Sequence, residues 1–312
     1  MTKGEIPTAP SLILAGALGI ISPPISYFLA NSEGTLPWLI DLATHFQGLY
    51  VLLLLVGLVI SLRKSRRYIW VVALLPLPWL TALESAPKSS SIQPGIKILS
   101  ANIHFKNNDL STLKNLITSE HPDIVVLLEL SHVQAGQLVD LKDYIFQQIQ
   151  PDNSPFGIGV ISRLPFSSVT TDWNWKGTSL KIPTIEVITK WKNQPIKLVA
   201  FHPMPPLAPE YHTVRNSKLK EIVEDSKQQR LPTIIAGDFN ATPWSSAFAG
   251  IDYYRATGLQ STWPFRHLGI AVDQILVSDH WKVKRSWVGP DIGSDHLPVI
   301  AEVHMQMNEK MP

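Results

Sequence analysis

The feature that most restricts how this chain folds is a recurring pattern of short apolar runs that each end in a polar side chain. The clearest example is Leu231–Asn240, LPTIIAGDFN, where Thr233–Ala236 has the length and β-branched content of a buried strand. Gly237 then gives the backbone room to turn. Asp238 and Asn240 stand two residues apart, so their side chains leave on the same side. The alternative is an ordinary turn, because Gly, Asp and Asn are all common in turns.

Polar residues end or interrupt other strand-like runs in the same way. The full set is Asn102, Glu129, His202, Asp238, Asn240, Asp273, Asp295 and His296. Strand ends meet at one rim of a sandwich, so we expect these side chains to form one site. Taken alone, each has a simpler explanation, such as a surface loop for His202 or a turn for Asp295 and His296. Glu129 is harder to dismiss, because it lies in the apolar run Asp123–Leu130, where an unpaired carboxylate is costly to bury.

From Ile96 onward, strand-like runs far outnumber helical ones. Helical spacing occurs at Asn108–Glu120 and at Glu210–Lys227, and short turns join many of the strands. This favours two packed sheets flanked by helices over a doubly wound nucleotide-binding fold.

The chain before this region is strongly apolar and raises the mean hydropathy of the whole sequence to +0.09. Three segments carry this character: Ser11–Ala30, Phe46–Leu62 and Tyr68–Leu83. The first is uncharged and long enough to cross a bilayer. A secretory signal is the alternative for this segment, but its apolar region is too long and two more segments follow. We therefore expect a bundle of three transmembrane helices over residues 1–86.

The charges near these segments predict their orientation. The loop between the second and third segments is basic, with Arg63, Lys64, Arg66 and Arg67. The other short loop, Asn31–His45, has no Lys or Arg, so the positive-inside rule places the basic loop in the cytoplasm and everything after Glu84 outside it. Glu84–Gly95 is rich in Ser and Pro, as tethers are. We expect a linker at 87–95 and a catalytic domain at 96–312.

Charge and cysteine content set further limits. The net charge of +2 argues against a dedicated nucleic-acid-binding coat but permits a local basic site. The absence of cysteine excludes disulfides and thiolate metal sites.

Several motifs occur in an order that resembles a known family. They are Asn102 after the first strand, PDIVVLLE ending at Glu129, GIGVISRLP at Gly157–Pro165, His202, GDFNATPW at Gly237–Trp244, VDQILVS at Val272–Ser278 and GSDHLPV at Gly293–Val299. Together they resemble the endonuclease/exonuclease/phosphatase superfamily over nearly all of residues 96–304. GDFN followed by SDH is the specific part of this resemblance. It implies an α/β (α+β) fold, a four-layer αββα sandwich with two mostly antiparallel sheets.

The resemblance also implies a role for each polar residue. Glu129 is expected to bind a divalent cation, with Asn102 and Asp295 nearby. These oxygen donors suit Mg²⁺ or Mn²⁺ rather than zinc. His296 is expected to act as general base, oriented by Asp273.

Two further groups complete the implied site. Asp238 is expected to orient the attacking water, and Asn240 and His202 to donate hydrogen bonds to the phosphoryl oxygens. Family members differ in which group is the base, so that assignment stays open. Many relatives have histidine where this chain has Gln274, and we expect this residue to tune the pocket. The loop Met204–Pro209 is either a rim that touches lipid or a proline-braced turn.

The three apolar segments and Thr262–Pro264 look like a bacterial, membrane-anchored branch of the superfamily, which includes glycopeptide-resistance hydrolases thought to act on lipid-linked pyrophosphate. This predicts a multi-pass protein of the bacterial inner membrane that hydrolyses a phosphodiester or pyrophosphate bond outside the cytoplasm, with the bilayer and a lipid-linked phosphate as partners. A membrane-tethered nuclease is the second hypothesis, and a catalytically silent binding module is the third. The sequence names no protein partner.

Overall fold

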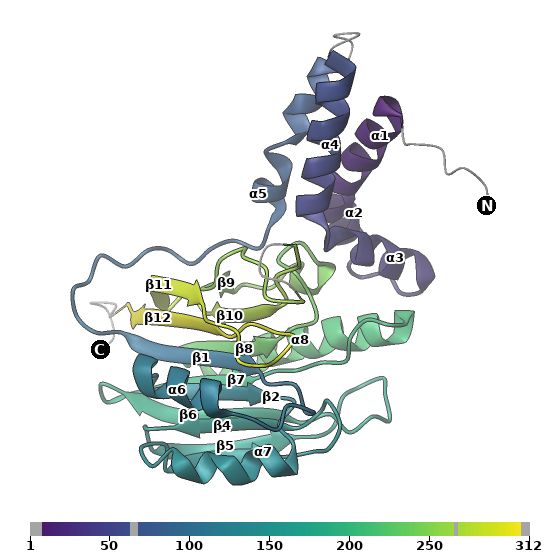
Figure 1. Cartoon of the computed structure of the whole chain (residues 1–312). Helices are drawn as coiled ribbons and strands as arrows, with labels where there is room; N and C mark the ends of the chain where they lie inside the picture. The colour runs from purple at the N-terminus through teal and green to yellow at the C-terminus, as the bar shows by residue number, and fades with distance from the viewer. Residues whose placement is uncertain (1–7, 63–67, 265–267, 307–312) are drawn as a thin grey trace. The chain divides into compact units, whose positions relative to one another are not determined.

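The computed structural model of the chain describes residues 8–62, 68–264 and 268–306. The chain forms two compact units, both drawn in Figure 1. The first, here called the helical unit, consists of Met1–Leu83, Pro206–Thr213 and Thr242–Ala249. The second, here called the sandwich unit, consists of Glu84–Pro205, Val214–Ala241 and Gly250–Pro312.

The sandwich unit contains two six-stranded sheets. The first has the order β11-β12-β1-β2-β4-β3. Its strands are β1 (Ile96–Asn102), β2 (Ile124–Leu128), β3 (Phe146–Gln150), β4 (Ile158–Ser162), β11 (Trp281–Val288) and β12 (Val299–Met305). The second has the order β5-β6-β7-β8-β10-β9. Its strands are β5 (Phe166–Asp172), β6 (Thr184–Trp191), β7 (Gln194–Ala200), β8 (Thr233–Asp238), β9 (Tyr254–Arg255) and β10 (Asp273–Val277).

Most neighbouring strands run antiparallel, and the pairs β1/β2 and β7/β8 run parallel. The sheets are therefore mixed, and they pack face to face as an α/β sandwich flanked by helices, which agrees with the expected fold class. The helices are α6 (Ser111–Glu120), α7 (His132–Gln137), the 3₁₀ turn η2 (Leu138–Asp140) and α8 (Pro209–Gln229), whose first turn belongs to the helical unit. The predicted helical stretches at Asn108–Glu120 and Glu210–Lys227 correspond to α6 and α8.

The side-chain alternation of the strands sorts the core into layers. In β1, Ile96 and Ile98 face the core between the two sheets, whereas Leu99 and Ala101 face the layer that holds α6. Successive strand residues point to opposite faces, so every second residue shares one environment. Figure 1 shows α6 and α7 beside the first sheet, where their apolar residues complete the outer layer.

The segment between the apolar region and β1 is packed, contrary to its tether-like composition. Ser85 forms a parallel bridge with Arg255 of β9, and Lys88 forms one with Val283 of β11. β9 and β11 are edge strands of the two different sheets. Ala86 lies between these bridges and is buried in the inter-sheet core. Residues 84–89 thus supply backbone partners to two open sheet edges. This part of the expected linker is therefore not a free tether.

The helical unit contains α1 (Ala9–Ile20), α2 (Ser22–Phe28), α3 (Thr35–Thr44), α4 (Gln47–Leu62), the 3₁₀ helix η1 (Ile69–Leu74), α5 (Leu77–Thr81) and the 3₁₀ turn η3 (Ser246–Phe248). Helices α1 and α4 approach closely at glycines. A Cβ on Gly16 would lie 2.7 Å from the backbone nitrogen of Leu54, and one on Gly57 would lie 2.8 Å from the Ile13 side chain. Small residues at such positions allow helix backbones to pack tightly.

The structure does not support three membrane-spanning helices. Among the described residues, one continuous stretch, Ala9–Phe28, is long and apolar enough to cross a bilayer. Thr35–Thr44 and Gln47–Ser61 pass the same test together, but they are bent by 69°. The third expected span is shorter, at Ile69–Thr81, since the prolines at its centre break it into a 3₁₀ helix and one short α-helix.

A long apolar helix also occurs in the cores of soluble proteins and in secretion signals, so length and composition do not by themselves establish an anchor. The basic loop used to orient the spans, residues 63–67, lies outside the described residues.

Candidate active site

Strand alternation carries three of the expected site residues to the space between the sheets. In β1, Asn102 points to the same face as Ile98, and in β8, Asp238 points to the same face as Ala236. Ile98 and Ala236 both face the core between the sheets. Asp273 begins β10 and lies directly opposite Asp238 in the antiparallel register. The same pleat that buries the apolar residues therefore places these polar side chains together at one end of the sandwich.

Gly237 is required next to Asp238 because β8 passes very close to the chain beyond β7. A Cβ at Gly237 would lie 1.8 Å from the carbonyl oxygen of Phe201, a distance that no side chain tolerates. Phe201 precedes His202, so this close approach also sets the spacing between His202 and Asp238.

Asp238 is the centre of the polar group. Its Oδ1 accepts a hydrogen bond from the Asn240 backbone N–H at 2.8 Å, and its Oδ2 accepts one from Nδ2 of Asn102 at 3.4 Å. The Nε2 atoms of His202 and His296 each lie 3.7 Å from the same Oδ2. Because Asp238 is only 2% exposed, these neighbours offset the cost of burying its charge.

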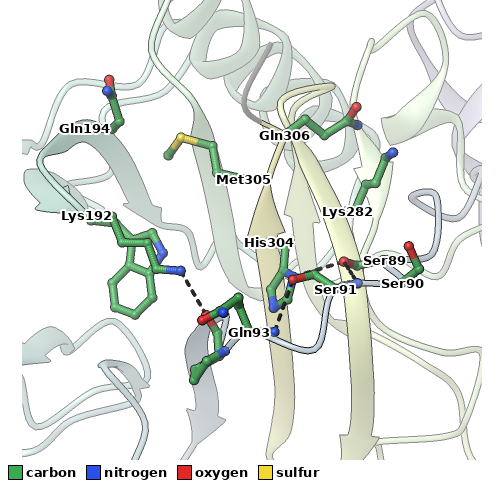
Figure 2. A pocket seen from close by; sticks show the side chains of 12 residues that line it. Ser89, Ser90, Ser91, Gln93, Lys192, Gln194, Lys282, His304, Met305 and Gln306 are labelled. Carbon is green, nitrogen blue, oxygen red and sulfur yellow. Dashed lines mark hydrogen bonds between the residues drawn. The ribbon is translucent and has the colours of Figure 1, made fainter. Parts of the chain in front are cut away.

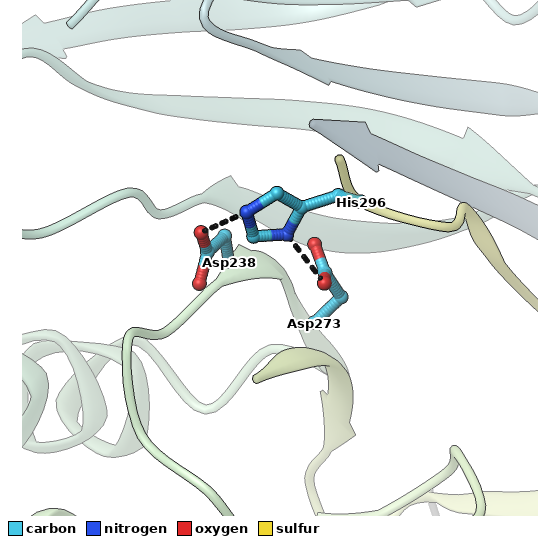
Figure 3. A group of neighbouring side chains, drawn as sticks. All are labelled: Asp238, Asp273 and His296. Carbon is cyan, nitrogen blue, oxygen red and sulfur yellow. Dashed lines mark hydrogen bonds and ion pairs between the residues drawn. The ribbon is translucent and has the colours of Figure 1, made fainter. Parts of the chain in front are cut away.

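His296 lies between two buried carboxylates, as Figure 3 shows. Its Nδ1 is 2.9 Å from Oδ2 of Asp273, and its Nε2 faces Asp238. Burial would lower the pKa of His296, but the negative charges of Asp273 and Asp238 outweigh burial and raise that pKa to about 10. Burial raises the pKa of the Asp273 carboxyl, while the charge of His296 opposes this rise. Since two carboxylates face one imidazole, we favour a raised pKa for His296, with one proton held in the hydrogen bond to Asp273.

Glu129 follows β2 in a left-handed conformation, with φ of 57°. This backbone region is uncommon for a residue with a side chain, and it occurs where surrounding contacts enforce it. Oε1 of Glu129 accepts a hydrogen bond from Nδ2 of Asn102 at 3.1 Å, and Oε2 accepts one from the Phe105 backbone N–H at 3.2 Å. The amide of Asn102 therefore faces both Glu129 and Asp238.

Asn240 also has a left-handed backbone, with φ of 47°. Its side-chain amide donates to the Pro203 carbonyl at 3.0 Å, which joins the loop after β8 to the loop that follows His202. Its own carbonyl accepts a hydrogen bond from Nη1 of Arg215 at 2.7 Å. Arg215 is a residue of α8 that the sequence analysis missed, because nothing in the spacing of a helix indicates a contact with a distant loop.

Asp295 is exposed. Among the described residues, its side chain is hydrogen-bonded to Nε1 of Trp263, at 3.0 Å, and not to Glu129 or Asn102. The Trp263 ring lies 6.1 Å from the His296 ring, centroid to centroid. Trp263, the central residue of the Thr262–Pro264 motif, is thus next to His296 in the site.

Two other residues flagged by the sequence are structural. Gln274 alternates with Asp273 on β10, and its amide bonds to Thr257 at 2.7 Å and to the Ala271 carbonyl at 2.9 Å. Its side chain therefore leaves on the opposite face from Asp273, and the expectation that Gln274 tunes the pocket stays a prediction. Arg163 pairs with Asp123 at 2.5 Å, away from the site residues.

A separate pocket of about 460 Å³ lies elsewhere in the sandwich unit (Figure 2). It is lined by Ser89, Ser90, Ser91, Gln93, Pro94, Trp191, Lys192, Gln194, Lys282, His304, Met305 and Gln306. His304 is near the end of β12, whereas His296 precedes the start of that strand, and Gln194 begins β7, whereas His202 follows its end. The pocket is therefore at the opposite end of the sandwich from the Asp238 group and contains none of the expected site residues.

The donor atoms near Asn102 fit a hard divalent cation. Glu129 and Asp238 present carboxylate oxygens to one amide, and Asn102 can offer its own carbonyl oxygen after a flip, so the set is rich in oxygen. Asp238, Asp273 and His296 form a second group whose potential ligand atoms all lie within 4.8 Å of one another. In that group the imidazole is already hydrogen-bonded to Asp273, so a cation there would compete with a proton.

Comparison with known proteins identifies the family of this chain. The model of the "Endonuclease/Exonuclease/phosphatase family" matches residues 99–296. No curated protein matches the sequence.

Solved structures share the fold at low sequence identity. D. rerio TDP2 complexed with a single-strand DNA product has 14% identity and a TM-score of 0.58, covering 68% of this chain and 100% of the other. The human Nocturnin catalytic domain with bound sulfate has 19% identity and a TM-score of 0.55, covering 69% and 96%. An endonuclease/exonuclease/phosphatase from Bacteroides vulgatus has 18% identity and a TM-score of 0.58, covering 69% and 100%.

Proposed function

This chain belongs to the endonuclease/exonuclease/phosphatase family, and from that premise we propose that it hydrolyses a phosphodiester or pyrophosphate bond of a lipid-linked substrate outside the cytoplasmic membrane, with a divalent cation. Endonucleases, exonucleases and phosphatases all hydrolyse phosphoric esters, so family membership gives the reaction class. The observation that carries the proposal is the convergence of three side chains, those of Asn102, His202 and His296, and of the Asn240 backbone N–H on the buried carboxylate of Asp238.

Each residue has a role that its position supports. Glu129 and Asn102 would hold Mg²⁺ or Mn²⁺, and the cation would supply positive charge for the phosphoryl oxygens. The side chain of Asp295 is already bonded to Trp263, so we assign it to the rim rather than to the ligand set. Asp238, between two imidazoles and an amide, orients the attacking water.

In its neutral form, His296 accepts the proton of the attacking water at Nε2, while Asp273 holds the ring in one orientation through Nδ1. His202 and the Asn240 amide donate hydrogen bonds to the phosphoryl oxygens as negative charge develops. The half-exposed Trp263 ring beside His296 offers an apolar wall for the group next to the phosphate.

The helical unit supports a membrane location. Large apolar side chains that are more than half exposed occur along its helices, including Leu14, Leu18, Phe28, Leu36, Leu49, Leu52, Val59, Trp70, Trp79 and Leu80. An exposed apolar surface of this kind is typical of a protein that contacts lipid or a partner. We propose association with the cytoplasmic membrane of a bacterium, with the sandwich unit on the outer side and the substrate in the outer leaflet.

A nuclease is the second candidate. The fold is shared with a TDP2 structure that holds a single-strand DNA product. Against this candidate, the lysines Lys181, Lys190, Lys192 and Lys197 are scattered and form no basic stripe in the sequence.

The test is a phosphate-release screen of the full-length protein in detergent with Mg²⁺ or Mn²⁺. The substrates are polyprenyl pyrophosphate, phospholipid, DNA and RNA, and the His296→Ala variant is the blank. We expect release from the lipid pyrophosphate and little cleavage of nucleic acid. Efficient cleavage of DNA without release from any lipid would support the nuclease, and a lack of activity on every substrate would support a silent binding module.

A further inference from the structure

Asp41 of α3 is a fully buried carboxylate of the helical unit. A charge in such surroundings is strongly destabilising unless donors satisfy it. Ser26, from the N-terminal helices, donates to it at 3.0 Å. Further donors come from two distant segments of the chain that are part of the same unit.

Most of these donors lie in Thr242–Ala249. Ser245 Oγ donates to the carboxylate at 3.0 Å, Ser246 N–H at 2.6 Å and Ser246 Oγ at 2.8 Å. His212, from the second segment, has Nε2 3.4 Å from Asp41 Oδ2 and 3.2 Å from Ser246 Oγ. Asp41 is therefore the common acceptor that joins both segments to α3.

Residues 242–246 are tied to the N-terminal helices one after another. Thr242 Oγ1 lies 2.9 Å from Nδ1 of His45, and the carbonyl of Pro243 accepts from the Leu83 N–H at 2.6 Å. Nε1 of Trp244 donates to the Pro78 carbonyl at 2.6 Å. Ser245 and Ser246 then bind Asp41. Five consecutive residues thus have partners in the N-terminal part of the chain, which is far more than an ordinary surface turn has.

This fixed segment is the direct continuation of the catalytic strand. Asp238 and Asn240 precede Thr242 by four and two residues. Asn240 needs its left-handed backbone to aim its amide and to present its N–H to Asp238. Arg215 holds the Asn240 carbonyl from one side, and the segment that starts at Thr242 fixes the chain on the other.

We propose that Asp41 is a positioning residue for the phosphoesterase reaction: by holding residues 245–246, it keeps the backbone after Asp238 and Asn240 in its working conformation. The proposal rests on the proposed reaction class and goes beyond it, since it gives the N-terminal helices a part in the chemistry that is independent of membrane attachment. A pure anchor would change turnover of lipid substrates alone. A positioning role changes turnover of every substrate, including a small water-soluble one.

The test compares four forms of the full-length protein in detergent: wild type, Asp41→Ala, Asp41→Asn and Thr44→Val. Thr44 is the matched control, because it is a fully buried residue of α3 whose hydroxyl bonds only to the Asp41 carbonyl of its own helix. Ser245→Ala is a second, milder variant, which removes one donor and leaves the carboxylate. The substrate is bis(p-nitrophenyl) phosphate, and the protein is also analysed by hydrogen–deuterium exchange.

We expect Asp41→Ala to lower kcat by roughly tenfold to a hundredfold with little change in KM, since small displacements of catalytic groups have effects of this size. Asp41→Asn and Ser245→Ala should lower kcat less, and Thr44→Val should not lower it. Exchange should increase at residues 239–241, which precede the segment that Asp41 binds, and not only at Ser246.

The outcomes separate this inference from the proposed function. Reduced thermal stability with unchanged kcat and unchanged exchange at 239–241 would show that Asp41 is only structural and would overturn the inference. If the wild type hydrolyses no phosphoric ester at all, the proposed function fails, and the exchange at 239–241 still decides whether Asp41 holds the strand end.

Discussion

Nδ1 of His296 lies 2.9 Å from Oδ2 of Asp273, while Asp273 stands directly opposite Asp238 in the β8/β10 register. Two carboxylates paired across neighbouring strands repel each other, and the imidazole between them relieves that repulsion. The three side chains therefore interact electrostatically as one group, and the charge of His296 depends on both carboxylates.

The first prediction concerns turnover. His296→Ala and Asp238→Ala should each lower kcat by about a hundredfold or more, because the proposed reaction places each group at the reacting atoms. The control is His280→Ala, which removes another histidine that pairs with a carboxylate, Asp279, at 2.9 Å. Near-wild-type rates in either site variant, with the melting temperature unchanged, would contradict the assignment.

The second prediction concerns the charge of His296. Asp273→Asn removes the largest contribution that raises the pKa of His296, so this pKa should fall from about 10 toward its ordinary value. The measurement is an NMR titration of the imidazole in chelator-treated protein. Turnover should fall less than in His296→Ala, because the base remains, although its orientation and its pKa both change. An unchanged titration would mean that Asp273 does not control the charge of this ring.

The third prediction concerns the metal. Turnover should require Mg²⁺ or Mn²⁺ and stop when a chelator is added, since the donors around Asn102 are oxygens. Glu129→Gln keeps the shape of the side chain but removes its charge, so it should raise the metal concentration needed for half-maximal activity by orders of magnitude. Isothermal titration of metal binding provides a readout apart from activity. Full turnover in excess chelator would refute the metal site.

Side-chain alternation explains why much of the fold and site could be predicted. The alternation of side chains along each strand puts three polar residues on the same face as buried apolar residues: Asn102, Asp238 and Asp273. Strand patterns in the sequence therefore already predict that these three lie together. The chemical roles of these residues do not follow from side-chain alternation. They were predicted from the resemblance that the GDFN and SDH motifs carry.

Long-range contacts explain what could not be predicted. Residues 84–89 have the composition of a free linker, yet their backbone groups pair with sheet edges that only the folded sandwich presents. Asp41 looked like a loop acid between two spans, but its partners lie some two hundred residues away in sequence. The third apolar segment is shortened by its prolines, which is a local cause visible in the sequence. The 69° bend between Thr35–Thr44 and Gln47–Ser61 was not predicted.

The fourth prediction concerns stability and pH. Burial opposes ionisation of Glu302, but hydrogen bonds from the Gly95 N–H, Arg285 and Lys284 outweigh it and lower the pKa of Glu302 to about 2. Because the pKa in the folded state is below the ordinary value of 4.5, the stabilisation is complete above about pH 4.5 and is lost as the pH falls toward 2.

Glu302→Gln should therefore destabilise the protein at neutral pH by up to about 3 kcal/mol, the equivalent of that pKa difference. The gap in melting temperature between wild type and variant should close as the pH falls from 5 to 2. Glu224→Gln, at an exposed position of α8, is the control and should show no such trend. A gap that stays constant with pH would mean that the ionised carboxylate is not what stabilises this edge.

The last prediction concerns the side of the membrane on which the sandwich unit lies. The basic loop around Ser65 and the chain end near Met311 both lie outside the described residues, so orientation rests on charge alone. A reporter that matures only outside the cytoplasm should be active when fused after Met311 and inactive when fused at Ser65. This result requires an odd number of membrane crossings between the two points. If both fusions are active or both are inactive, the helices after Ser65 do not cross the bilayer. If only the Ser65 fusion is active, the sandwich unit faces the cytoplasm, and lipid-linked substrates of the outer leaflet are excluded.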